Sequence, residues 1–156
     1  MDAEPGAEDF DAAYEAGVRF LARREHARRE LQRKLRARGF SDAVVGQVLD
    51  RLVQERYLSD DRFTEAFVRQ RCEQGQGPLK IIAALGERGI DESLARHHLS
   101  QQEVDWLAQA REARRRRFGE ALPADRREWA RQARFLASRG FSSEEVYRVL
   151  DESAHE

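Results

Sequence analysis

A six-residue motif occurs three times in the chain at almost constant spacing, and it constrains the fold more than any other feature. In each copy Leu stands four residues before a Gly, Arg stands one residue before it, and a large apolar residue follows it. The three glycines, Gly39, Gly89 and Gly140, are 50 and 51 residues apart. A fixed period of this length is typical of tandem structural repeats.

The motif predicts a helix end, a tight turn and the start of a second helix. Leu35, Leu85 and Leu136 would hold the turn from one side, and the glycine would supply the positive φ that a helix end favours. Apolar residues on both sides of the motif recur every three or four positions, as in helices, and no alternating strand pattern occurs. Another apolar helical stretch precedes each motif, and Phe63 and Phe67 in the middle one are predicted core residues.

The predicted fold is therefore all-α, with three tandem three-helix repeats. The expected ranges are a disordered acidic tail over residues 1–11 and repeats over 12–58, 59–101 and 102–152. Pro78 and Pro123 are predicted to begin helices, where a missing amide donor costs nothing. Further helix starts are predicted from side-chain caps. These are Ser41, Asp91 and the capping boxes Ser100 with Glu103 and Ser142 with Glu145.

The formal net charge of −1 conceals two strongly basic blocks. Residues 16–40 hold nine basic and two acidic residues, and residues 111–139 hold ten and four. We expect part of both blocks to contact an anionic partner. The candidate residues are Arg24, Arg28, Arg29, Arg33, Lys34, Arg111, Arg114, Arg115, Arg116 and Arg117. The alternative is a solvated helix face with internal pairs such as Glu30 with Lys34, and part of the run 114–117 must stack inward on Trp106 or Phe118.

Catalytic, metal and cofactor sites are not expected. The single cysteine, Cys72, excludes an internal disulfide, and His26, His97, His98 and His155 lack a metal-ligand spacing. The stretch 75–78 lacks the Lys and Ser or Thr of a phosphate loop. The acidic start and the absence of a long apolar run predict a cytoplasmic protein without a membrane segment.

The order of these motifs resembles the RecX family over about residues 12–152. The first repeat carries the run 21–31, then Lys34-Leu35 and Gly39-Phe40, and the linker 56–63 leads into the middle repeat. The middle repeat carries the most distinctive residues, and the last rests on Phe135, Gly140-Phe141 and Ser142. Those of the middle repeat are Phe67-Val68, Arg69, Arg71, Gly75, Gly77-Pro78, Ile81, Leu85 and Gly89-Ile90. Ala27 departs from the pattern, because many relatives have a capping Ser there, and Thr64 replaces a usual Ala.

The resemblance implies an elongated, curved, non-enzymatic protein that binds in the groove of the RecA–DNA filament. It implies inhibition of the ATPase, strand-exchange and co-protease activities of RecA, and hence modulation of DNA repair, recombination and the SOS response. The expected partner is the RecA filament, with DNA contacted weakly or as part of it, and the expected state is a monomer. The basic helices leave an alternative open, an independent helix-turn-helix-like DNA-binding protein.

Overall fold

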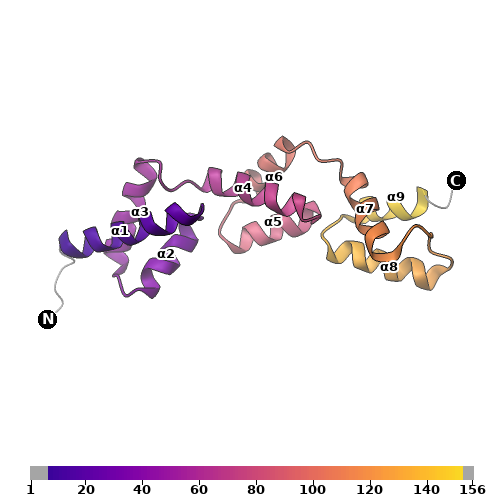
Figure 1. The fold of residues 1–156 in the computed structure, drawn as a ribbon, viewed down its shortest axis with the longest axis horizontal. Helices are drawn as coiled ribbons and strands as arrows, with labels where there is room; N and C mark the ends of the chain where they lie inside the picture. Colours follow the sequence, from indigo (N-terminus) through magenta and orange to yellow (C-terminus); the bar gives the residue numbers. More distant parts are fainter. Residues whose placement is uncertain (1–6, 153–156) are drawn as a thin grey trace. The chain divides into compact units, whose positions relative to one another are not determined.

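The computed structural model describes residues 7–152, and within them every regular element is an α-helix, as the sequence predicts (Figure 1). The nine helices in this range form three groups of three along the chain. Their bounds are α1 Ala7–Arg23, α2 Arg28–Ala37, α3 Asp42–Gln54, α4 Asp60–Glu73, α5 Pro78–Glu87, α6 Glu92–Gln101, α7 Trp106–Phe118, α8 Arg126–Ser138 and α9 Ser143–Glu152.

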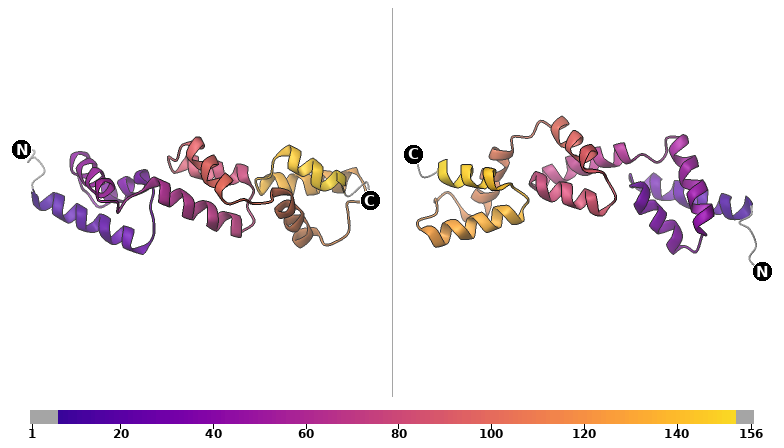
Figure 2. Two further views of the ribbon diagram at one scale, coloured as in Figure 1. Left: turned by 90° about the horizontal axis from the view of Figure 1, so that it is seen from above. Right: turned by 180° about the vertical axis from the view of Figure 1, so that it is seen from behind.

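The first compact unit comprises the described residues up to Ala66 together with Arg88–Ile90. In it α1, α2 and α3 pack against one another in all three pairs (Figures 1 and 2). Their apolar faces form one buried cluster, with Phe20, Val18 and Leu21 of α1 partly buried against it. Its fully buried side chains include Leu31, Leu35, Val44, Val45, Val48, Leu49, Leu52 and Leu58.

Helix α1 begins at Ala7, so the prediction of a disordered tail over residues 1–11 is wrong for residues 7–11. Glu8 and Asp9 lie in the first helical turn, where acidic side chains interact favourably with the helix dipole. Phe10 packs against the core of the first unit and stacks on Tyr14, with 6.1 Å between ring centroids. These contacts extend the helix into the acidic segment. Residues 1–6 of the predicted tail lie outside the described residues.

The second compact unit comprises residues 67–87 and the described residues from Asp91 onward. In it α5 packs against α6, and α7, α8 and α9 pack against one another in pairs. The last three helices enclose a cluster of Ala110, Leu136, Phe141, Val146, Val149 and Leu150. Leu85 and Leu136, like Leu35 in the first unit, are completely buried. The predicted core residues Phe63, in the first unit, and Phe67, in the second, are 5% and 7% exposed.

The three motif glycines have the left-handed backbone that the sequence predicts, with φ of +94° at Gly39, +81° at Gly89 and +100° at Gly140. Their surroundings differ. A Cβ atom at Gly39 would meet nothing within 4 Å, whereas one at Gly89 would lie 2.7 Å from Cδ of Arg29. A Cβ atom at Gly140 would collide with the backbone and Cβ of Lys80. At Gly140, glycine is therefore required by close packing as well as by φ.

The middle helices of the first two groups are capped by residues that come later in the chain. Ala27 provides no side-chain cap for α2, and the amide of Arg28 donates to Asp60 Oδ1 at 2.7 Å. At the start of α5, the amides of Gly77 and Leu79 donate to the carbonyls of Arg139 and Gly140, at 2.7 and 2.9 Å. Helix α8 differs, because its own Asp125 accepts from the amide of Glu128 at 2.8 Å.

The predicted local caps are partly correct. Ser41 accepts from the amide of Val44, and Ser142 with Glu145 forms the predicted capping box. Asp91 makes no side-chain cap bond. The predicted box of Ser100 and Glu103 is wrong, because Ser100 lies within α6 and donates to the carbonyl of His97.

The two prolines also differ. Pro78 is the first residue of α5, as predicted. Pro123 does not begin a helix, because it lies in the connection before α8, and α8 starts at Arg126 behind the cap Asp125.

Candidate partner-binding surface

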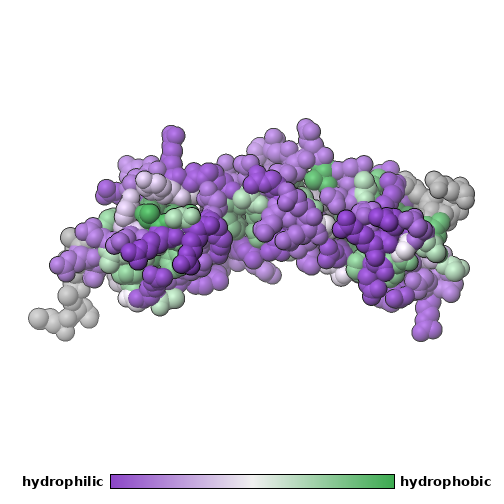
Figure 3. Space-filling view, viewed as in Figure 1, coloured by the Kyte–Doolittle hydropathy of each residue, from purple (hydrophilic) through white to green (hydrophobic). Residues whose placement is uncertain are grey.

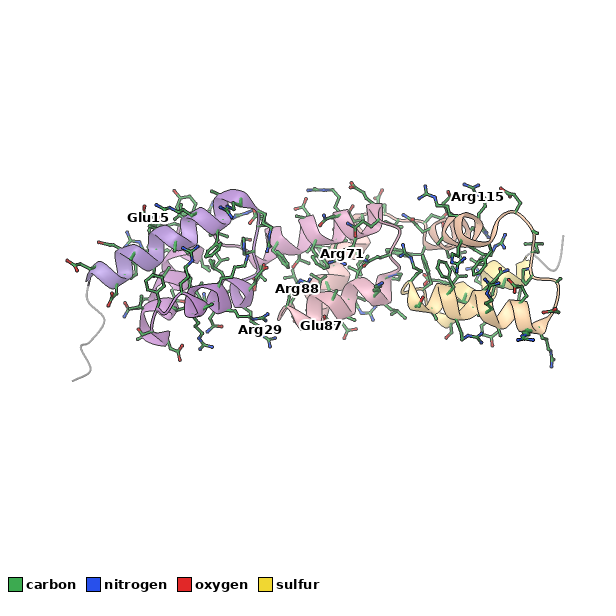
Figure 4. All side chains as sticks on the ribbon, turned by 60° about the horizontal axis from the view of Figure 1, so that its bottom comes forward. Glu15, Arg29, Arg71, Glu87, Arg88 and Arg115 are labelled. Carbon is green, nitrogen blue, oxygen red and sulfur yellow. The ribbon has the colours of Figure 1, made fainter. Side chains whose placement is uncertain are left out.

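A row of arginines lies on the solvent side of α2. Arg29, Arg33 and Arg36 follow one another at four and three residues, so they share a helix face. This face lies opposite the buried Leu31 and Leu35, and all three arginines are exposed. Arg36 pairs with Asp42, whereas Arg29 and Arg33 make no ion pair within residues 7–152. Arg29 lies in the first turn of α2, and its exposed side chain (Figure 4) runs beside the Gly89 turn. We call these three residues the α2 face.

The other predicted site residues of the first block have partners inside the first unit. Arg24 forms a bidentate pair with Glu30, at 3.0 and 2.6 Å. Arg28 pairs with Asp50 at 2.7 Å. Lys34 Nζ lies 2.8 Å from His26 Nε2 and 5.0 Å from the centroid of the Phe20 ring. Arg24 and Lys34 therefore organise the connection between α1 and α2, Arg28 links α2 to α3, and Arg29 and Arg33 remain available to a partner.

His26 is a buried neutral imidazole at the centre of this arrangement, with 1% of its surface exposed. Its Nδ1 lies 3.0 Å from the carbonyl oxygen of Arg24, which can only accept, so Nδ1 carries the proton. Its Nε2 then accepts from the Lys34 ammonium, which can only donate. Burial is the main cause that lowers the pKa of His26, and the positive charges of Arg24 and Lys34 lower it further. The hydrogen bond to the Arg24 carbonyl and the charge of Glu30 act in the opposite direction, but the net effect is a lowered pKa.

Stability should therefore fall as the pH drops below about 7. The pKa of His26 is lower in the folded chain than its unfolded value of about 6.5, so the unfolded state binds the proton more readily. The stabilisation is complete above the unfolded pKa and is lost as pH falls through the folded pKa. Urea denaturation at several pH values should show a shallower slope for His26→Gln than for the native chain. His97→Gln, at an exposed position, is the control and should keep the native slope. An unchanged slope in His26→Gln would contradict the assignment.

Arg114, predicted as a partner-binding residue, is instead a buried structural residue with 6% exposure. It lies four residues after the buried Ala110, on the inner side of α7. Its Nη1 donates to the carbonyl of Ala121 at 3.1 Å and to Gln132 Oε1 at 3.2 Å. Arg114 thus ties the connection between α7 and α8 to both helices. A variant that neutralises residues 114–117 together would therefore also disturb the fold.

Arg114→Met should destabilise the chain by about 2–3 kcal/mol, because it leaves the buried Gln132 and the Ala121 carbonyl without their donor. The free energy of unfolding from urea titration measures the effect. Arg116→Met is a matched control in the same run, since Arg116 is exposed and, within residues 7–152, pairs only with Glu112. It should stay within about 0.5 kcal/mol of the native value. Equal losses in the two variants would refute the structural role of Arg114.

The remaining arginines of this run are exposed, with different partners. Arg115 and Arg116 both donate hydrogen bonds to the Glu112 carboxylate. These bonds, above all the one from Arg115, lower the pKa of Glu112 to about 2. Arg115 lies on the outer side of α7 (Figure 4). Arg117 lies over the rings of Phe118 and Phe135, at 5.4 and 6.0 Å from their centroids. Arg111 is exposed and has an interaction partner.

A second basic face, not singled out from the sequence, lies on α8. Arg127, Arg131 and Arg134 repeat the spacing of four and three residues seen on α2, and all three are exposed. Arg131 pairs with Glu128 and lies 5.3 Å from the Phe118 ring, which Arg117 also contacts. The spacing was the available signal, but the four consecutive arginines of α7 were more conspicuous. We call Arg127, Arg131 and Arg134 the α8 face.

Hydrophilic side chains cover most of the face visible in Figure 3, with small apolar patches between them. Among residues 7–152, no helix combines the length and the apolar character that a membrane span requires. The same residues contain no cluster of three or more His, Cys, Asp and Glu side chains placed to hold a metal ion.

Three consecutive three-helix groups, each with a glycine turn between its second and third helices, define a tandem helical-repeat protein with arginine-rich outer faces. Models of the three RecX three-helix domains match the chain in order: the first over residues 13–52, the second over 59–99 and the third over 103–150. The chain belongs to the RecX family, as the sequence motifs indicate.

Curated relatives and solved structures agree with this assignment. The chain is 51% identical over 136 residues to the regulatory protein RecX of Halorhodospira halophila, covering 87% of this chain and 84% of the relative. It is 48% identical over 130 residues to the regulatory protein RecX of Pseudomonas entomophila, covering 83% and 84%. The crystal structure of RecX from Lactobacillus salivarius has the same fold, with a TM-score of 0.81 at 21% identity over 97% of this chain and all of that one.

Proposed function

We propose that the chain is a negative regulator of the RecA recombinase. In this proposal it binds the RecA–DNA filament in the cytoplasm as a monomer and lowers the ATPase, strand-exchange and co-protease activities of RecA. Membership of a family of regulatory proteins supports a regulatory role. The RecA filament as the target follows from the family resemblance of the motifs, and the described surface is consistent with an anionic partner.

The α2 and α8 faces are the observation that carries this proposal. Each places three arginines on one exposed helix side, and Arg29, Arg33, Arg127 and Arg134 make no ion pair within the described residues. Guanidinium groups in such rows bind phosphates or carboxylates bidentately. A nucleoprotein filament offers both kinds of anion on one surface, so two separate basic faces suit it.

The alternative, an independent helix-turn-helix DNA-binding protein, is less consistent with the same geometry. A helix-turn-helix domain reads bases with the second helix of the motif, which here is α3, α6 or α9. Their exposed sides carry acids, including Asp42 and Asp50 on α3, Glu92 on α6 and Glu144 on α9. Acidic side chains there would oppose entry into a DNA groove. The α2 and α8 faces lie on the helices that precede α3 and α9, and the exposed Arg51 of α3 and Arg96 of α6 each pair with an acid of the chain.

Two assays on the full chain test the proposal. The DNA-dependent ATPase of RecA is measured with increasing amounts of the protein, and labelled DNA is titrated with and without RecA. We expect inhibition of the ATPase, together with binding to RecA–DNA filaments that is much tighter than binding to bare DNA. An unaffected ATPase would overturn the proposal. Tight, sequence-selective binding to bare duplex DNA would support the alternative instead.

A further inference from the structure

The first unit contains an open cavity of about 490 Å³ beside the connection between α3 and α4. Its lining holds three arginines and one acid. The lining residues are Arg28, Val53, Arg56, Leu58, Ser59, Asp60 and Arg62. Asp60 accepts from the amide of Arg28, and Arg62 donates to the carbonyl of Arg56 at 2.7 Å. The Arg62 guanidinium is thus held at the turn, and Arg28 and Arg56 line the same open space.

Arg56 has a backbone conformation that arginine rarely adopts, with φ of +66°. It follows the end of α3 in a Schellman turn, with bonds from Arg56 N to Val53 O and from Tyr57 N to Leu52 O. The same pair of bonds closes the turns after α4 and α8, and there the equivalent residues are Gly75 and Gly140. Folding alone therefore favours glycine at position 56.

The arginine side chain has no ionic partner that would explain this strain. Arg56 is exposed, and within residues 7–152 no carboxylate forms an ion pair with it. Arg28 and Arg62, in contrast, are held by Asp50 and Glu25, at 2.7 and 2.9 Å. Arg56 therefore keeps its charge available to a partner at a position where folding alone would favour glycine.

We propose that this cavity binds a backbone phosphate of DNA, with Arg56 as the principal contact and Arg28 and Arg62 beside it. The fork of an arginine matches phosphate oxygens, and Val53, which is 45% exposed, and Leu58 form an apolar wall on which a sugar can rest. The carboxylates of Asp50 and Glu25 already pair with Arg28 and Arg62, so a carboxylate of a partner protein would compete with them for the same arginines. A polyanion also gains from counterion release. The biological meaning of this site rests on the proposed function, because it would anchor the regulator to the DNA of the filament.

Arg56→Gly separates folding from binding and is the decisive variant. It relieves the strained turn, so it should raise the melting temperature by about 2–4 °C. It also removes the phosphate contact, so the affinity of the full chain for a fluorescein-labelled 20-nucleotide DNA should fall about fivefold or more. The slope of log affinity against log salt, measured from 50 to 200 mM NaCl, should decrease by about one. Arg56→Lys should keep the slope but lose part of the affinity.

Glu103→Gly is the matched control, because Glu103 occupies the corresponding position after α6 with φ of +52°. It should also raise the melting temperature and should leave DNA affinity unchanged. The proposal is overturned if Arg56→Gly binds DNA as tightly as the native chain, or if the native chain does not bind this DNA at 50 mM NaCl. It is likewise overturned if inorganic phosphate stabilises the native chain and Arg56→Gly nevertheless keeps the native affinity for DNA. A polyglutamate peptide that displaces the DNA at an equal concentration of charges would overturn it as well. None of these outcomes changes whether the native chain inhibits RecA, so failure of this site and failure of the proposed function are distinguishable.

Discussion

Gly140→Ala is expected to destabilise the chain by about 3 kcal/mol or more. A Cβ atom would be forced into a left-handed backbone with φ of +100°, and it would lie 2.7 Å from the amide nitrogen of Lys80 and 2.9 Å from the carbonyl oxygen of Gly77. Backbone atoms cannot move aside as the end of a side chain can. The substitution should also break the bond from the Leu79 amide to the Gly140 carbonyl. Urea denaturation measures the free energy, and amide exchange at Leu79 measures the bond.

Gly39→Ala is the matched control, because Gly39 occupies the corresponding turn with φ of +94° and open space around it. It bears only the backbone penalty, so we expect a loss of about 1 kcal/mol. Similar losses at the two positions would show that the contact of Gly140 with the start of α5 contributes nothing to stability.

Charge reversal on the two arginine faces should have the largest effect on activity. The variants are Arg29→Glu with Arg33→Glu for the α2 face and Arg127→Glu with Arg134→Glu for the α8 face. Each pair should raise the concentration needed to inhibit RecA by about tenfold or more, since two favourable contacts to an anionic surface become repulsive. The four arginines are exposed and make no ion pair in the described part of the chain, so melting temperatures should remain close to the native value.

The control for these faces is Arg19→Glu with Glu15→Arg, which exchanges the two members of an exposed pair on α1 and leaves the net charge unchanged. It should inhibit RecA like the native chain. Loss of inhibition on both faces would indicate a long footprint on the filament, and loss on one would place the anchor there. Inhibition curves that coincide with the native curve for both face variants, across a range of salt, would remove the arginine faces from the mechanism.

The repeat architecture could be predicted from the sequence because it depends on local signals. The glycine period, the leucine four residues before each glycine and the apolar helical spacing each specify a helix end or a helix face. The start of α1 was also present in the sequence, since Phe10 precedes Ala13 and Tyr14 at helical spacing. The acidic composition of the segment around Phe10 favoured the prediction of a disordered tail over this helical spacing.

The candidate site was predicted less completely, because it depends on contacts between distant segments. The burial of Arg114 requires the chain to return past Glu120 and Ala121, and no local pattern specifies that path. Similarly, the cap that Ala27 lacks is supplied by Asp60, 33 residues later. These contacts decide which arginines remain available to a partner. The composition therefore identified the two basic blocks, residues 16–40 and 111–139, but not which of their arginines are exposed and unpaired in the described part of the chain.

The order in which the helices receive their caps bears on how the protein matures during synthesis. A nascent chain that has reached residue 101 contains all of α5, but the carbonyls of Arg139 and Gly140 that bind its first amides do not yet exist. Helix α2 waits in the same way for Asp60, whereas α8 brings its own Asp125. Full protection of the earlier segments therefore arrives only with the later ones. Prematurely ended chains should therefore be cut by proteases preferentially at the start of α5.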